Sequence, residues 1–196
     1  MEERFDGPDL DPSRWVASYL PAWSSREASA ATYALGPDGL RLSVPPEHPR
    51  WCPDLHEEPL RVSAVQSGSW SGPVGSTRGQ QPFRDGLVVR EAQPTLRGIL
   101  VHHGRVEVAC SARVAAGSMF SAWMIGMEDE PERCGEICLV EVLGSSLADD
   151  GTAEVGRGVH AFRDPALVEE FAAPRRTIDV GEPHVYAVDW RPDGIH

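Results

Sequence analysis

The sequence predicts an all-β protein, an antiparallel sandwich of two β-sheets, on three observations. The chain has 196 residues, of which 19 are glycine and 17 are proline, and so many turn-forming residues disfavour a helical bundle. Segments in which apolar and polar residues alternate recur along the chain, as in half-buried strands. One segment alone, residues 164–171, has the sequence signals of an α-helix. Regularly spaced strands with a single short helix are typical of a sandwich.

The individual elements follow from local patterns. Residues 31–44 predict a β-hairpin, because two alternating runs flank the turn sequence Gly36-Pro-Asp-Gly39. The helix at 164–171 would begin at Asp164 as its N-cap, with Pro165 in the first turn. Residues 67–86 read as a long polar loop. Further strands are expected at 61–66, 87–90, 104–114, 119–126, 135–143, 155–162 and 184–190.

The charge of the chain excludes some classes of partner. With 30 acidic and 18 basic residues the formal net charge is −12, which repels both nucleic-acid phosphates and anionic membrane surfaces. The longest purely apolar run, residues 122–125, is too short to cross a bilayer. We therefore expect no nucleic-acid partner and no membrane partner.

The use of particular residue types narrows the chemistry further. All basic residues other than histidine are arginine, and both lysine and asparagine are missing, a pattern typical of a GC-rich bacterial genome. A lysine Schiff base and a P-loop lysine are thereby excluded.

No secretory leader opens the chain, which predicts a cytoplasmic protein, or an extracellular one if a leader was removed. The 4 cysteines have no framework spacing, so we expect free thiols.

The segment that indicates chemistry is residues 134–142. On a strand, Glu136 and Cys138 share one face, whereas Glu141, at an odd offset from Glu136, would lie on the other. A β-bulge near Leu139 or Val140, with Val140 as the extra residue, would return Glu141 to the first face. Two carboxylates on one face can act as nucleophile and general acid at a glycosidic bond. The ordinary alternative is a solvated strand face.

The segment Gly135-Glu-Ile-Cys-Leu-Val-Glu141 resembles the Glu-Ile-Asp-x-x-Glu signature of glycoside hydrolase family 16, which includes laminarinases and lichenases. Further weak matches lie in the family's order: Phe5-Asp-Gly and Trp15 near the start, then residues 104–108, 120–126, 158–160 and 184–190. The resemblance implies a concanavalin A-like jelly roll with a substrate cleft on one sheet. It also implies a retaining, endo-acting hydrolase or transglycosylase of β-linked polysaccharides such as β-glucans.

The resemblance also implies roles for individual residues. Glu136 would be the nucleophile and Glu141 the general acid/base. Cys138 falls where the family has an Asp that hydrogen-bonds the nucleophile, and a neutral thiol is a weaker donor. Trp123 and His160 would face the cleft and bind substrate, although core packing of Trp123 and an ordinary strand histidine are the alternatives.

Two loop tryptophans, Trp51 and Trp70, are further candidates for stacking on sugar rings, with burial in the core as the alternative. We expect no catalytic metal, because His102 and His103 with Cys134 and Cys138 lack zinc-site spacing. No cofactor is expected. Members of the family often bind a structural calcium, but no dense acidic ligand loop is visible here.

The expected organisation is one domain over residues 1–196, acting as a monomer on a polysaccharide or oligosaccharide. The family continues beyond the point that corresponds to His196, so we expect the sandwich to lack C-terminal strands. Two other functions stay open. One is a non-catalytic carbohydrate-binding protein on the same fold, favoured by Cys138. The other is an interaction module without a sugar ligand.

Overall fold

The computed structural model describes residues 1–196 and confirms an all-β protein with antiparallel sheets. It contains no α-helix, only the two 3₁₀ turns η1 (Pro21–Trp23) and η2 (Gly144–Ser146). The chain forms two compact units. Unit 1 comprises Met1–Leu100 and Met127–Pro131, and unit 2 comprises Val101–Gly126 and Glu132–His196. The prediction of a single domain over 1–196 stays a prediction.

Unit 1 contains the predicted hairpin. Strands β1 (Thr32–Gly36) and β2 (Gly39–Ser43) pair antiparallel, and Gly39 adopts a φ of 97°, a turn conformation that favours glycine. A second short pair joins β3 (Gly68–Ser69) to β4 (Leu96–Arg97). Most of unit 1 otherwise consists of loops.

The core of unit 1 is built from these loops rather than from a sheet. Trp23 is fully buried and its indole N–H donates to the Gln80 carbonyl at 2.7 Å. The other buried members of this cluster are Leu20, Ala22, Trp51, Cys52, Leu87 and Val89. Burial of these side chains is what orders the irregular chain around them.

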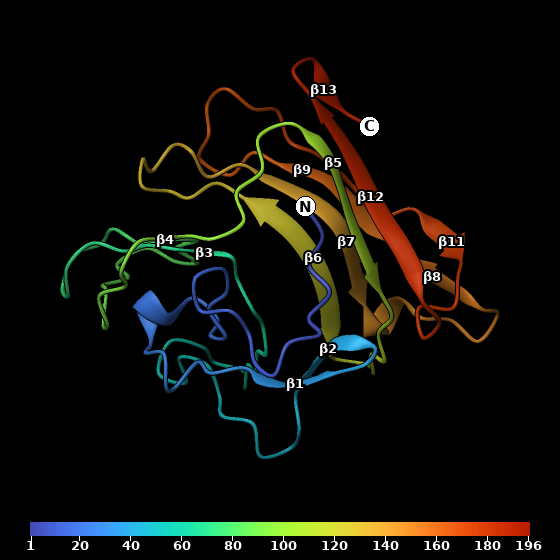
Figure 1. The fold of residues 1–196 in the computed structure, drawn as a ribbon, viewed down its shortest axis with the longest axis horizontal. Coiled ribbons are helices and arrows are strands. Elements are labelled where there is room, and N and C mark those ends of the chain that lie inside the picture. The colour runs from blue at the N-terminus through green and yellow to red at the C-terminus, as the bar shows by residue number, and fades with distance from the viewer. The chain divides into compact units, whose positions relative to one another are not determined.

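Unit 2 contains the long strands (Figure 1). One sheet has the order β10-β9-β7-β6 and a second has the order β13-β12-β5, while β8 pairs with β11. The strands are β5 (Gly104–Cys110), β6 (Met119–Ile125), β7 (Glu136–Leu143), β8 (Thr152–Glu154), β9 (Gly156–His160), β10 (Glu170–Ala172), β11 (Arg175–Thr177), β12 (His184–Arg191) and β13 (Gly194–Ile195).

The core of unit 2 lies against one face of β7. Val140 and Val142 of β7 are fully buried, together with Ala153 of β8. Phe120 of β6 and Tyr186 of β12 pack onto the same cluster, with ring centroids 6.4 Å apart. The two sheets of unit 2 therefore share an apolar layer, as expected for a sandwich.

The prediction of a helix at 164–171 is wrong. Asp164 does cap a turn, since its carboxylate accepts from the Ala166 N–H at 2.9 Å. The chain then extends, and Glu170, Phe171 and Ala172 pair with β9 as strand β10. An eight-residue helix is marginal in isolation, so pairing to the sheet edge decides the conformation.

Two predicted strands are also absent. Residues 61–66 form no ladder beyond an isolated bridge between Val16 and Gln66. In residues 87–90 the Val89 N–H bonds to the Ser76 carbonyl and the Arg90 N–H to the Ala22 carbonyl, so loops take the place of a partner strand. Alternation indicated extended, half-buried chain at both places, but it could not show whether a strand lies alongside.

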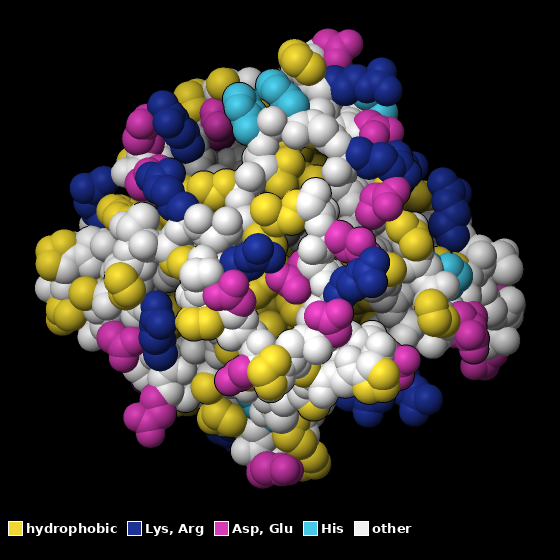
Figure 2. All heavy atoms as spheres, viewed as in Figure 1, with side chains coloured by type: hydrophobic (Ala, Val, Ile, Leu, Met, Phe, Trp, Pro, Cys, Tyr) yellow, Lys and Arg dark blue, Asp and Glu magenta, His cyan; other side chains and the backbone are white.

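The surface carries both signs of charge. On the face shown in Figure 2, arginine side chains and acidic side chains are interspersed. The structure has no helix with the length and hydropathy required to span a bilayer.

Candidate active site

Strand β7 contains the predicted bulge. Its register shifts between Cys138 and Glu141 against β9, and in the pairing with β6 Cys138 faces Trp123 while Val140 faces Ala122. Leu139 is therefore the residue without a partner on β6. The bulge was expected with Val140 as the extra residue, and the register corrects that detail.

The bulge decides which side chains of β7 lie on each of its two faces. Val140 and Val142 enter the apolar core, so the alternation places Glu141 on the opposite face, where Glu136 and Cys138 also lie. We call this surface the carboxylate face. It consists of Glu136, Cys138 and Glu141 with the cross-strand partners Trp123 on β6 and His160 on β9. The structure thus brings five of the seven predicted site residues together.

Glu136 is the electrostatic centre of this face. The pKa of Glu136 is raised from its ordinary value of 4.5 to about 7, chiefly by burial and also by the negative charges of Glu141 and Glu169. His160 acts in the opposite direction and lowers it. Glu136 therefore exchanges its proton near neutral pH.

Cys138 contributes no charge to the face. Its side chain is buried, with 4% of the residue exposed. Burial, followed by the charges of Glu136 and Glu141, raises the pKa of the thiol to about 12. The group is a neutral, weak hydrogen-bond donor at any physiological pH.

His160 is fixed by partners that the sequence did not indicate. Its Nδ1 lies 2.6 Å from a carboxylate oxygen of Glu169, and its ring stacks on Phe171 with centroids 4.3 Å apart. Both partners fall in the segment predicted to be helical. A three-residue edge strand gives too little alternation to be found, so the sequence held no clear signal for Glu169 or Phe171.

Phe171 lies close to the carboxylate face because β9 is rich in glycine. A Cβ atom on Gly156 would meet Phe171 Cζ at 2.6 Å and Glu141 Cβ at 3.1 Å. Gly158, with a φ of 134°, faces Cys138 across the ladder and lets the β10 backbone approach. The missing side chains on β9 leave the space that the Phe171 ring occupies.

The loop tryptophans behave differently. Trp51 is buried at 4% exposure, and its ring lies 5.0 Å from Tyr19 and 4.8 Å from Phe83, between centroids. The prediction that Trp51 binds substrate is wrong, because the ring is part of the unit 1 core. Trp70 is partly buried, with the Arg78 guanidinium 5.0 Å from its ring centroid. Its role as a binding residue stays a prediction.

The structure contains no group of three or more His, Cys, Asp or Glu side chains arranged to hold a metal ion. His102 and His103 stack on each other at 4.2 Å and pack edge-on against Trp190. All four cysteines are free thiols.

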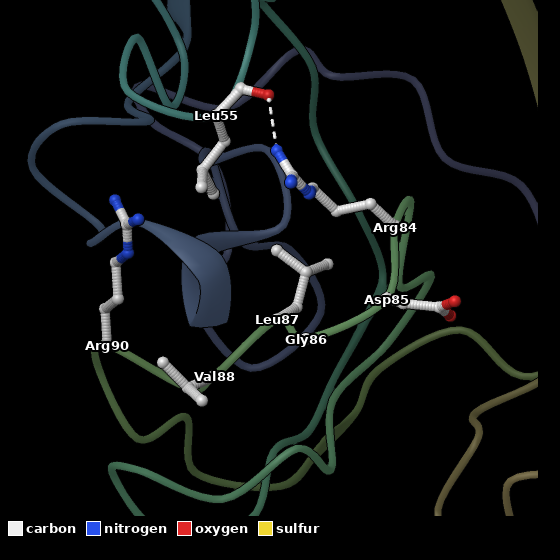
Figure 3. Close-up of a pocket in the computed structure, with 7 residues that line it drawn as sticks. All are labelled: Leu55, Arg84, Asp85, Gly86, Leu87, Val88 and Arg90. Carbon is white, nitrogen blue, oxygen red and sulfur yellow. Dashed lines mark hydrogen bonds between the residues drawn. The ribbon is translucent and has the colours of Figure 1, made fainter.

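Small pockets occur elsewhere. One of about 110 Å³ in unit 1 is lined in part by Leu55, Arg84 and Arg90 (Figure 3). There Arg84 donates to the Leu55 carbonyl at 3.2 Å, and Arg90 makes a bidentate ion pair with Asp54. Both arginines are thus engaged within the chain. None of the predicted site residues lines this pocket.

Comparison with solved structures gives a match to a glycosidase. A GlcNAcα1-4Gal-releasing endo-β-galactosidase from Clostridium perfringens superposes on 97% of this chain with a TM-score of 0.74 and 25% sequence identity. This chain covers 47% of that structure, so it spans about half its length. Neither a protein-family model nor a curated protein matches the chain. The chain therefore has the fold of a β-sandwich glycosidase.

Proposed function

We propose that the protein is a retaining, endo-acting hydrolase or transglycosylase of β-linked glycans, with Glu136 as nucleophile and Glu141 as general acid/base. The observation that carries this proposal is the bulge between Cys138 and Glu141, because it puts both carboxyl groups on one face of β7. The charge of Glu141 acts on Glu136 across this face. The glycosidase-like fold supports a carbohydrate substrate.

The two carboxyl groups would act in two steps. In the first, the Glu136 carboxylate attacks the anomeric carbon while Glu141 gives its proton to the departing glycosidic oxygen. The product is a covalent glycosyl ester on Glu136 and an ionised Glu141. In the second, Glu141 takes a proton from water, or from a sugar hydroxyl in a transglycosylase, and the oxygen of that acceptor displaces Glu136. Both groups then return to their starting forms.

Turnover should depend on pH through Glu136. The nucleophile must be ionised, and burial holds the pKa of Glu136 at about 7. The acid limb of kcat/KM should therefore lie near pH 7 rather than near the ordinary glutamate value.

Release of reducing sugar from a panel of glycans tests the proposal. The panel contains laminarin and lichenan as β-glucans, and a β-galactoside chain capped with GlcNAcα1-4Gal, which the solved neighbour's name suggests. We expect at least one substrate to be cut internally. Glu136→Gln should abolish turnover, while Glu182→Gln, a change at an exposed position, should leave it intact. Azide should partly restore the Glu141→Gln variant on activated aryl glycosides. Equal, unrescued losses in both site variants would contradict the roles.

A non-catalytic carbohydrate-binding protein is the second candidate. The observation that favours it is the neutral thiol of Cys138 beside a Glu136 that is only partly ionised at neutral pH. Retarded migration in glycan-containing gels, without reducing-sugar release above pH 7, would support this candidate over the enzyme.

A further inference from the structure

Glu136 and His160 face each other across the β7–β9 ladder. Glu136 is the first residue of β7, His160 is the last residue of β9, and the two are register partners. Residues directly opposite in an antiparallel pair have Cβ atoms roughly 4.5–5.5 Å apart, so their side chains interact. His160 is thus a direct neighbour of the proposed nucleophile.

Glu169 ties this histidine to the backbone of its own loop. One carboxylate oxygen of Glu169 lies 2.6 Å from His160 Nδ1, and the other accepts from the Ala161 N–H at 2.8 Å. An ionised carboxylate only accepts hydrogen bonds, so Nδ1 carries the proton in this pair. The Phe171 ring, stacked at 4.3 Å, fixes the plane of the imidazole. The hydrogen bond and the stacked ring therefore hold the histidine in one orientation.

Few other charges act on Glu136. On β7 its neighbour Cys138 is uncharged and Glu141 is an acid, and Glu169 is a second acid beyond the histidine. Its partner on β6 is the apolar Ile125. Of the charged groups that act on Glu136, only His160 favours the ionised carboxylate.

We propose that Glu169 is a positioning residue that acts through His160. It holds the imidazole beside Glu136 in one orientation with Nδ1 protonated, and His160 thereby favours the ionised carboxylate that a nucleophile requires. The link to catalysis rests on the proposed function of Glu136, whereas the electrostatic coupling itself does not.

The two ways in which Glu169 can act on Glu136 have opposite signs. Its own negative charge disfavours the ionised Glu136, so removing that charge alone would lower the pKa of Glu136. If Glu169 acts chiefly through His160, removing it frees the imidazole from its place beside Glu136, and the pKa of Glu136 rises. The sign of the change in Glu169→Gln therefore decides between the two.

The test is a carbon-13 NMR titration of the Glu136 side-chain carboxyl, assigned by its loss in Glu136→Gln. His160→Gln should raise the pKa of Glu136 by about one unit, the lower end of the effect of an adjacent opposite charge. Glu169→Gln should raise it by less. In the His160→Gln background, Glu169→Gln should cause no further rise, since the route through the histidine is gone.

Glu170→Gln is the matched control, because Glu170 follows Glu169 in the chain, is exposed and begins β10. This variant should leave the titration of Glu136 unchanged. A lowered or unchanged Glu136 pKa in folded Glu169→Gln overturns the proposal. If that variant does not fold, His160→Gln decides alone, and an unchanged pKa there overturns it. The titration needs no turnover, so a protein that binds but does not cut glycans would refute the proposed function and leave this coupling measurable.

Discussion

A partly buried carboxyl group with a pKa near neutrality reduces the free energy of unfolding once it has to ionise. Glu136 is partly buried, and burial is the largest cause of the rise in its pKa to about 7. In the unfolded chain the same group would ionise near its ordinary value of 4.5. The folded state therefore binds this proton more tightly than the unfolded state does, and stability must depend on pH through Glu136.

Glu136→Gln should stabilise the protein at alkaline pH. The stabilising effect of a protonated Glu136 is complete below pH 4.5 and is lost as pH rises to about 7, because the buried group must then ionise. The amide does not titrate, so at pH 8 the variant should exceed the wild type by up to about 3 kcal/mol in free energy of unfolding. Urea unfolding at pH 5 and pH 8 measures this. The difference should be small at pH 5, and Glu182→Gln should show no such pH dependence.

Cys138 should resist alkylation in the folded protein. Thiolates rather than thiols react, and a pKa of about 12 leaves few thiolates at pH 8. Relative to the unfolded chain, labelling by iodoacetamide should slow by about 10³-fold from the thiolate fraction alone. Peptide mapping by mass spectrometry, with and without urea, gives the two rates. Labelling of Cys138 at equal rates in both would show that the thiol is open and ionisable.

At the scale of the element, the bulge and the glycines of β9 act together. The bulge turns Glu141 onto the face of Glu136, and Gly156 opposite Glu141 leaves room for the Phe171 ring. A side chain on β9 at this point would separate β10 from the carboxylate face. Phe171 in turn stacks on His160, so one small residue affects several parts of the site.

Gly156→Ala should therefore destabilise the protein and disturb the site. The added Cβ would lie 2.6 Å from Phe171 Cζ, which forces the ring to move. Overpacking of this kind costs about 1–3 kcal/mol, measurable by urea unfolding. Gly36→Ala on β1 is the control, since a Cβ there meets nothing within 4 Å. Equal free energies of unfolding for the two variants would mean that β10 shifts to make room for the added methyl group without destabilising the protein.

At the scale of the whole molecule, one architecture accommodates two different kinds of core. In unit 2 the apolar faces of long strands pack together, whereas in unit 1 loops bury Trp23 and Trp51 with little regular structure. The match to the endo-β-galactosidase covers 97% of the chain and therefore includes both units. The core of unit 1 and the candidate active site are built from different residues, because the loop-built core contains none of the residues of the carboxylate face.

The sequence by itself determined the all-β class, the hairpin at β1–β2, the long strands β6, β7 and β12, and the bulge. These depend on turn residues and on alternation, which are local properties of the chain. Only the tertiary structure decided that residues 164–172 leave a turn to form β10 and bring Glu169 and Phe171 to His160. It also decided that Trp51 is buried. Pairing at a sheet edge and burial of a loop depend on partners far away in the chain, and no local pattern records which partner will be there.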